Sequence, residues 1–168
     1  MFNRNKNKET WLTVLEDYVN SRNNLLLMEK GFERISAQDG PGMGALITFS
    51  NKIIEFDLIN DKSQYFIDVR SAKYPDKSYS QAFLIAISKL LKANKSFTQL
   101  SEKEKISLYE IVYDYSDPFK FFFLNYDDIL FVLDENNFDN SMKELESFLD
   151  ERVKWLFPKL YYKDSSKP

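Results

Sequence analysis

Asp57, Asp68 and Arg70 are the residues of this chain whose types and spacing come nearest to hydrolytic chemistry. The two aspartates fall on neighbouring expected strands, and an acid on an earlier helix, such as Glu16, is available to join them. Carboxylates grouped in this way hold a divalent metal ion, which activates a water molecule while a nearby lysine assists. The third position here is arginine, which does not readily give up its proton and replaces that lysine poorly.

The same order of a helix, an aspartate on one strand and an acid-x-lysine pair on the next resembles the restriction-endonuclease-like nucleases. The chain departs from that pattern at Asp68-Val69-Arg70, and the usual proline-aspartate introduction is missing. Polar residues that alternate along the exposed face of a sheet explain these letters without any chemistry. We therefore expect a protein that is not an enzyme, with no catalytic residues, no metal ion and no cofactor.

Cysteine and histidine are both absent from the 168 residues. Their absence excludes disulfide bonds, thiol nucleophiles, imidazole acid-base catalysis and the zinc sites that these ligands build. The formal net charge of −3 argues against nucleic-acid binding, because affinity for phosphates depends on concentrated lysine and arginine. A polar N-terminus and the lack of a long apolar run indicate a cytoplasmic protein without a membrane segment.

The net charge hides a strongly acidic segment between Tyr109 and Asp139. This segment has eight acids and the single base Lys120, which gives a local charge of −7. The same segment is rich in tyrosine and phenylalanine. Aromatic rings beside carboxylates suit a protein interface, because the rings supply buried anchors and the charges attract a basic partner.

We predict that seven residues of this segment contact a partner protein, namely Asp114, Asp117, Tyr126, Asp127, Asp128, Asp134 and Glu135. The alternative is that the phenylalanines form the core while the acids only solvate the surface, and the sequence leaves both interpretations open. A calcium site is not expected, because the acidic pairs lack the alternating oxygen ligands and the central glycine of a calcium loop.

Three of the four glycines fall in the stretch Gln38–Gly44. A glycine-rich loop that cradles a phosphate must open a helix, so that the free amides of the first turn face the anion. This loop precedes a strand instead, and we expect it to be a hairpin connection.

Apolar residues at helical spacing predict a first helix over 9–30, with Leu25 on its buried stripe. Positions 20–24 are poor in helix formers and are a possible interruption. Gly31 then ends the helix in the left-handed conformation, and Phe32 packs back onto the helix.

A short strand is expected over 32–37, and the stretch 44–71 predicts three consecutive antiparallel strands joined by tight turns. The alternation of residue types gives the sheet an apolar face and a polar face. The apolar face carries Ile54, Phe56, Leu58, Tyr65, Ile67 and Val69, and the polar face carries Glu55, Asp57, Asp68 and Arg70.

The second half of the chain predicts helices. One begins at Ser78 or Ser80 and ends near Asn94, and the next opens with a capping box at Ser101-Glu102-Lys103-Glu104. A third begins at Asp117-Pro118, with Phe119–Leu124 favoured as helix over a buried strand, and resumes after Asn125 through Leu133. Asp139 or Asn140 caps the last helix, which Pro158 closes.

These elements predict an α+β fold with an N-terminal helix, an antiparallel meander of about four strands, and then four to five helices packed on one face of the sheet. We expect a single domain over residues 1–163, because a chain of this length buries one core of ordinary size. Residues 164–168 are expected to form a frayed tail.

The order of elements, with Lys30-Gly31-Phe32, the meander from Gly44 and the acidic stretch Asn125-Tyr126-Asp127-Asp128, resembles the small α+β immunity proteins of bacterial polymorphic-toxin and contact-dependent inhibition systems. The resemblance covers the whole chain. It implies a cytoplasmic protein that binds one cognate toxin, often a basic nuclease, and blocks it by covering or distorting the active site.

Under that resemblance, the carboxylates imitate phosphates for the lysines and arginines of the toxin, and the tyrosines fill the spaces between them. A generic protein-binding adaptor or regulator is the alternative. An adaptor predicts neither a strongly acidic surface nor a toxin gene beside its own.

Overall fold

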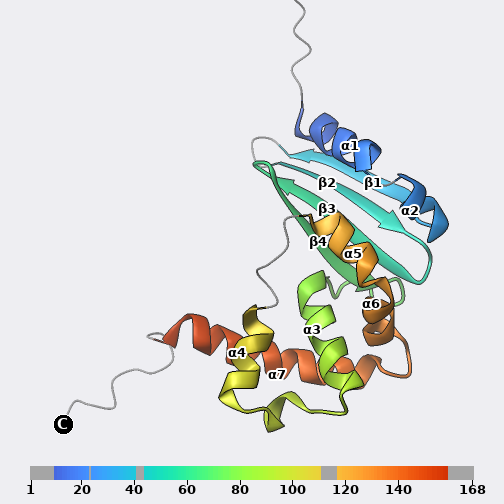
Figure 1. The fold of residues 1–168 in the computed structure, drawn as a ribbon. Helices are drawn as coiled ribbons and strands as arrows, with labels where there is room; N and C mark the ends of the chain where they lie inside the picture. Colours follow the sequence, from blue (N-terminus) through green and yellow to red (C-terminus); the bar gives the residue numbers. More distant parts are fainter. Residues whose placement is uncertain (1–9, 23, 41–43, 111–116, 159–168) are drawn as a thin grey trace, which may run out of the picture. The chain divides into compact units, whose positions relative to one another are not determined.

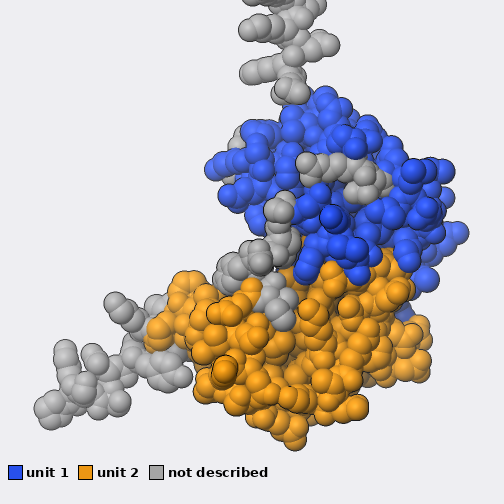
Figure 2. All heavy atoms as spheres, viewed as in Figure 1, with its two compact units in different colours: residues 1–80, 117–124 blue, residues 81–116, 125–168 orange. Residues whose placement is uncertain are grey.

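The computed structural model describes residues 10–22, 24–40, 44–110 and 117–158 (Figure 1). Internal contacts divide the chain into two compact units, which Figure 2 shows in blue and orange. We call them the sheet unit, residues 1–80 and 117–124, and the helical unit, residues 81–116 and 125–168. The expected single domain over 1–163 stays a prediction, and the tail over 164–168 lies outside the described residues.

The sheet unit has strands in the order β1-β2-β3-β4-β5, and all neighbours are antiparallel. The strands are β1 (Glu33–Gly40), β2 (Gly44–Ser50), β3 (Ile54–Asp61), β4 (Gln64–Ser71) and β5 (Tyr79–Ser80). Its helices are α1 (Trp11–Arg22), α2 (Asn24–Glu29) and α5 (Pro118–Leu124). The α+β class and the meander are confirmed. A fifth strand is present because the two residues of β5 pair with β4.

The expected helix over 9–30 is present as the two helices α1 and α2, and α1 ends and α2 begins within the run over 20–24 that is poor in helix formers. Its end is as predicted. Gly31 has φ +69°, the amide of Phe32 donates to the carbonyl of Leu27 at 2.8 Å, and the amide of Gly31 donates to Met28 at 3.0 Å. These two bonds form a Schellman cap, which directs the chain into β1.

Asparagine side chains close the tight turns of the meander. The Asn51 carbonyl oxygen accepts from the amides of Ile53 and Ile54, at 3.2 and 3.0 Å. Asn60 accepts from the amide of Ser63 at 2.9 Å. The predicted turn chemistry is thus confirmed, since an asparagine side chain holds the backbone of a turn in this way.

Gly44 is required where β2 passes β3. Its φ is +119°, and a Cβ atom at this position would lie 1.8 Å from the carbonyl oxygen of Asn60. No side chain fits at that distance, so the close approach of the two strands depends on glycine.

One face of the sheet forms the core of this unit, because α1 and α5 contact the strands there. The expected apolar face is confirmed, as Phe56 and Val69 are fully buried. Tyr18 of α1 stacks on Tyr65 with ring centroids 4.1 Å apart, and Phe122 of α5 meets Phe56 at 4.6 Å. The segment 119–124 lies in the helix α5, as predicted in preference to a strand, and its rings at 119 and 122 belong to the core.

The helical unit is built around α3 (Gln81–Lys92), which contacts α6 (Tyr126–Leu133) and α7 (Phe138–Leu156). It also contains the short 3-10 helix η1 (Phe97–Gln99) and α4 (Glu102–Glu110). Leu84, Ile85, Ala86 and Ile87 are fully buried, which explains why α3 is apolar almost all round.

The start of α4 confirms the predicted capping box. The Ser101 amide donates to the Glu104 carboxylate at 2.9 Å, and the Glu104 amide donates back to the serine hydroxyl at 3.4 Å. The predicted cap of the last helix at Asp139 or Asn140 is wrong. The N-cap of α7 is Asn137, and the helix begins earlier because Phe138 is buried in the core.

An aromatic cluster joins α4 to α7, with Tyr109 on α4 and Phe148 and Trp155 on α7. The Tyr109 ring is 5.5 Å from that of Phe148 and 5.2 Å from that of Trp155, which is 44% exposed. Burial raises the pKa of Tyr109 to about 12, with further contributions from Glu151 and Glu102.

Among the described residues, no helix is both long enough and apolar enough to cross a bilayer.

Candidate functional site

The acidic segment between Tyr109 and Asp139 contributes to both units, because residues 117–124 belong to the sheet unit and residues 125–139 to the helical unit. Most of its described aromatic residues belong to the core. Tyr126, predicted to contact a partner, is only 6% exposed, and Tyr109 and Phe119 are at 3% and 0%. These rings therefore stabilise the fold, and the exposed positions among the described residues of the segment are mainly acids, together with Lys120, Leu124 and Asn136.

Asp117 and Asp128, two of the predicted contact residues, are held by hydrogen bonds within the protein. Asp117 caps α5, since its carboxylate accepts from the amide of Lys120 at 3.1 Å and from the hydroxyl of Tyr18 at 2.9 Å. The carboxylate of Asp128 accepts from Lys92 at 2.6 Å and from Ser88 at 2.7 Å. Partial burial opposes ionisation of Asp128, but these two donors outweigh burial and lower its pKa.

Asp114 lies outside the described residues. The other acids of the segment, Asp127, Asp134, Glu135 and Asp139, are exposed on α6, on α7 and in the turn between them. We call these four the α6–α7 carboxylates. Asp134 organises the turn, because it accepts from the amide of Asn136 at 2.9 Å. Within the described part of the chain, Asp127 and Asp139 take part in no ion pair.

The polar face of the sheet carries a transverse row of side chains. Cα pairing places Ser36, Thr48, Asp57, Asp68 and Ser80 opposite one another across all strands, in that order. Ser36 donates to Thr48 at 3.0 Å, and Thr48 donates to Asp57 at 2.7 Å. Hydrogen bonds thus join the first three residues of this polar row, which lies on the face opposite the core.

Arg70 pairs with two of the three carboxylates on this face. Its guanidinium donates to Asp57 at 2.6 Å and to Glu55 at 3.0 Å. Burial would lower the pKa of Arg70, but the two carboxylates raise it. Asp68 forms no ion pair among the described residues, and its pKa is raised by burial and by the charge of Asp57 opposite.

These residues do not assemble with Glu16, the helical acid that a metal-dependent nuclease would need. Glu16 pairs with Arg34 at 2.7 Å, on the side of the sheet that α1 covers. Within the described ranges, no three acids lie close enough together to hold a metal ion. Arg70 holds Asp57 by hydrogen bonds from two of its nitrogens, so the face is an ion-pair network.

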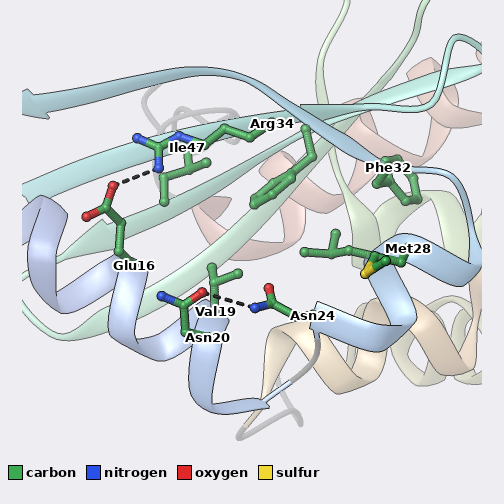
Figure 3. Close-up of a pocket in the computed structure, with 10 residues that line it drawn as sticks. Glu16, Val19, Asn20, Asn24, Met28, Phe32, Arg34 and Ile47 are labelled. Carbon is green, nitrogen blue, oxygen red and sulfur yellow. Dashed lines mark hydrogen bonds and ion pairs between the residues drawn. The ribbon is translucent and has the colours of Figure 1, made fainter.

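A groove between the helices α1 and α2 and the strands β1 and β2 is a separate candidate (Figure 3). Its volume is about 490 Å³. Its floor consists of buried apolar side chains, namely Val19, Leu27, Phe32, Ile47 and Phe49. Its rim carries the ion pair of Glu16 with Arg34, and the side chains of Asn20, Asn24 and Met28.

Sequence reasoning missed this groove, because it depends on the path of two helices over one edge of the sheet. Leu25 was expected on the buried stripe and is 76% exposed. Met28 on the same helix is 74% exposed. The asparagines at 20 and 24 were the available signal, since polar amides at helical spacing share one face of a helix.

In comparisons with protein-family models, with curated protein sequences and with solved structures, no significant match to this chain was found.

Proposed function

We propose that the protein is a toxin-neutralising immunity protein, which binds a basic protein domain through the α6–α7 carboxylates and blocks it. One observation carries the proposal. From Asn125 to Met142 the chain has five acids and no lysine or arginine. Asp128 is paired with Lys92, whereas Asp127 and Asp139 are exposed and take part in no ion pair within the described residues. The remaining carboxylates present charge of one sign to solvent.

Such a surface suits a basic partner for a physical reason. Exposed charges of one sign attract an oppositely charged surface during diffusion, which raises the association rate and suppresses wrong partners. The resemblance of the chain to immunity proteins supplies the class of partner, a nuclease-type toxin domain whose lysines and arginines bind phosphates. The buried aromatic residues leave charge as the main contribution of this segment.

The test uses neutral isosteres, so that helix N-termini are not exposed to added positive charge. The variant Asp127→Asn, Glu135→Gln, Asp139→Asn removes three exposed charges. Its matched control, Glu110→Gln, Glu146→Gln, Asp150→Asn, removes the same number of exposed charges elsewhere in the helical unit. The partner is the purified product of the gene immediately upstream, and affinity is measured by titration at low and moderate salt.

We expect the first variant to bind roughly tenfold more weakly and with a smaller salt dependence, because rim charges act mainly on the association rate. The control should retain both properties. Wild-type affinity and salt dependence in the first variant would contradict the role of these carboxylates. Failure of the wild-type protein to bind the upstream product would contradict the immunity function itself.

A further inference from the structure

We propose that the groove between α1–α2 and β1–β2 is a docking site for an extended, uncharged segment of a partner polypeptide, which places an apolar side chain on the groove floor. This inference does not rest on the proposed function, because the groove belongs to the sheet unit and the α6–α7 carboxylates to the helical unit. The argument follows from charge, hydrogen-bonding groups and position in the sheet.

The groove is electrically neutral. Its two charged residues, Glu16 and Arg34, are paired at 2.7 Å and are each about half-exposed or less, at 36% and 45%. A strongly charged ligand would have to break this pair or remain uncompensated. A neutral segment avoids both costs, and this charge balance favours an uncharged polypeptide over a nucleic acid or a basic peptide.

The asparagines on the rim match a peptide group. The Asn24 side-chain amide donates to the carbonyl oxygen of Asn20 at 3.1 Å (Figure 3). This bond leaves amide hydrogens on Asn20 and a carbonyl oxygen on Asn24 for other partners. A backbone peptide unit offers one acceptor and one donor, so the joined pair can bind the main chain of a ligand whatever its sequence.

The apolar part of the groove accommodates a side chain. The floor residues Ile47 and Phe49 are buried at 1% and 5% exposure, while Met28 stands 74% exposed at the rim. Methionine is flexible and polarisable, and such side chains adapt to varied apolar ligands. A volume of about 490 Å³ lies within the range of ligand sites and exceeds the size of one side chain.

The position of β1 adds main-chain groups to the site. β1 is an edge strand of the sheet, and its residue Arg34 lines the groove. An edge strand presents backbone donors and acceptors that a second extended chain can use. A peptide lying beside β1 would therefore gain backbone hydrogen bonds while its side chain enters the groove.

The test compares two substitutions on one helix. Met28→Asp places a charge at the groove rim, and Leu25→Asp places the same charge at an equally exposed position that does not line the groove. The probe is a displayed library of random seven-residue peptides, selected on the full chain. We expect selected peptides to be uncharged, with one recurrent large apolar position, and to bind Met28→Asp at least tenfold more weakly than Leu25→Asp.

A second variant addresses the rim. Asn20→Ala with Asn24→Ala should weaken the selected peptides severalfold while leaving the melting temperature near that of the wild type, because both side chains are exposed. The proposal is overturned if no peptide is enriched, if the recurrent positions are charged, or if the two aspartate variants bind equally. A dimer in sedimentation that Met28→Asp dissociates would also overturn it, by assigning the groove to a second copy of the chain.

Discussion

In the sheet unit, the guanidinium of Arg70 pairs with both Glu55 and Asp57, whereas Asp68, opposite Asp57, has no ion-pair partner in the part of the chain that the structure describes. The helical unit distributes its donors differently. Asp128 accepts from Lys92 and Ser88, and Glu144 accepts from Ser96 and from the first residue of η1, Phe97. Both units thus contain buried or partly buried carboxylates, but these carboxylates have more hydrogen-bond and charge partners in the helical unit than in the sheet unit.

The difference follows from the geometry of the elements. Antiparallel register fixes which residues lie opposite each other, so Asp57 and Asp68 meet across β3 and β4 whether or not a cation is near. Helices that pack on one another bring lysines and loop amides to a carboxylate from several directions. The pKa of Asp68 is therefore raised, while the pKa of Asp128 is lowered.

Glu144 tests the carboxylates of the helical unit, which have more hydrogen-bond and charge partners. It is 8% exposed, and its carboxylate accepts from the Phe97 amide at 2.6 Å and from Ser96 at 2.8 Å. We expect Glu144→Ala to lower the free energy of unfolding by about 2–3 kcal/mol, because it leaves buried donors without an acceptor. Urea denaturation measures the loss.

The exposed neighbour Glu146 provides the control, and Glu146→Ala should change stability by less than about 0.5 kcal/mol. Glu144→Gln should recover part of the loss, since its amide oxygen still accepts. Equal stability of Glu144→Ala and Glu146→Ala would remove the contrast between the units.

Asp68 tests the carboxylates of the sheet unit, which have fewer partners. A folded-state pKa above the unfolded value contributes stability that is present below the unfolded pKa and is lost as pH rises through the folded pKa. Asp68→Asn should therefore stabilise the protein at neutral pH by up to about 1 kcal/mol, the usual range for like charges on paired strands. The gain should disappear in acid, where Asp68 is protonated.

Stability at several pH values checks this expectation, and Asp57→Asn is the matched change. That substitution should destabilise, because it removes the negative charge that pairs with Arg70, although the amide oxygen can still accept from Thr48. A loss of stability in Asp68→Asn at neutral pH would mean that Asp68 is adequately compensated.

The smallest expected change in stability is at Glu104, whose pKa is shifted in the opposite direction to that of Asp68. Hydrogen bonds from Lys95 and Ser101 lower its pKa to about 2. A lowered pKa contributes stability above the unfolded value, and this contribution is lost as pH falls through the folded pKa. Glu104→Gln should be slightly less stable than the wild type near pH 6, and the difference should vanish toward pH 2. A pH-independent difference would contradict the ionic origin of this cap.

Local signals predicted the elements of this fold well. Gly31, the asparagine turns and the Ser101 capping box act through neighbours within a few residues, so their spacing is visible in the sequence. The early start of α7 was not predicted, because it depends on burial of Phe138 by residues distant in sequence. Local cap preferences are small compared with the burial of a large ring.

The candidate sites were less predictable. A count of charges found the acidic segment but could not separate Asp127, which is exposed, from Asp128, which pairs with a lysine 36 residues away. The burial of Tyr126 was likewise not visible in the sequence, because it depends on packing in three dimensions. The groove was missed altogether, because its walls come from α1, α2, β1 and β2.

The chain has only two tryptophans, and they lie in different units. Trp11 begins α1, whereas Trp155 lies near the end of α7 with its ring 5.2 Å from that of Tyr109. The molecule thus carries one intrinsic fluorophore for each unit. With Trp11→Phe or Trp155→Phe, the emission of the remaining indole follows the unfolding of one unit alone, without any added dye.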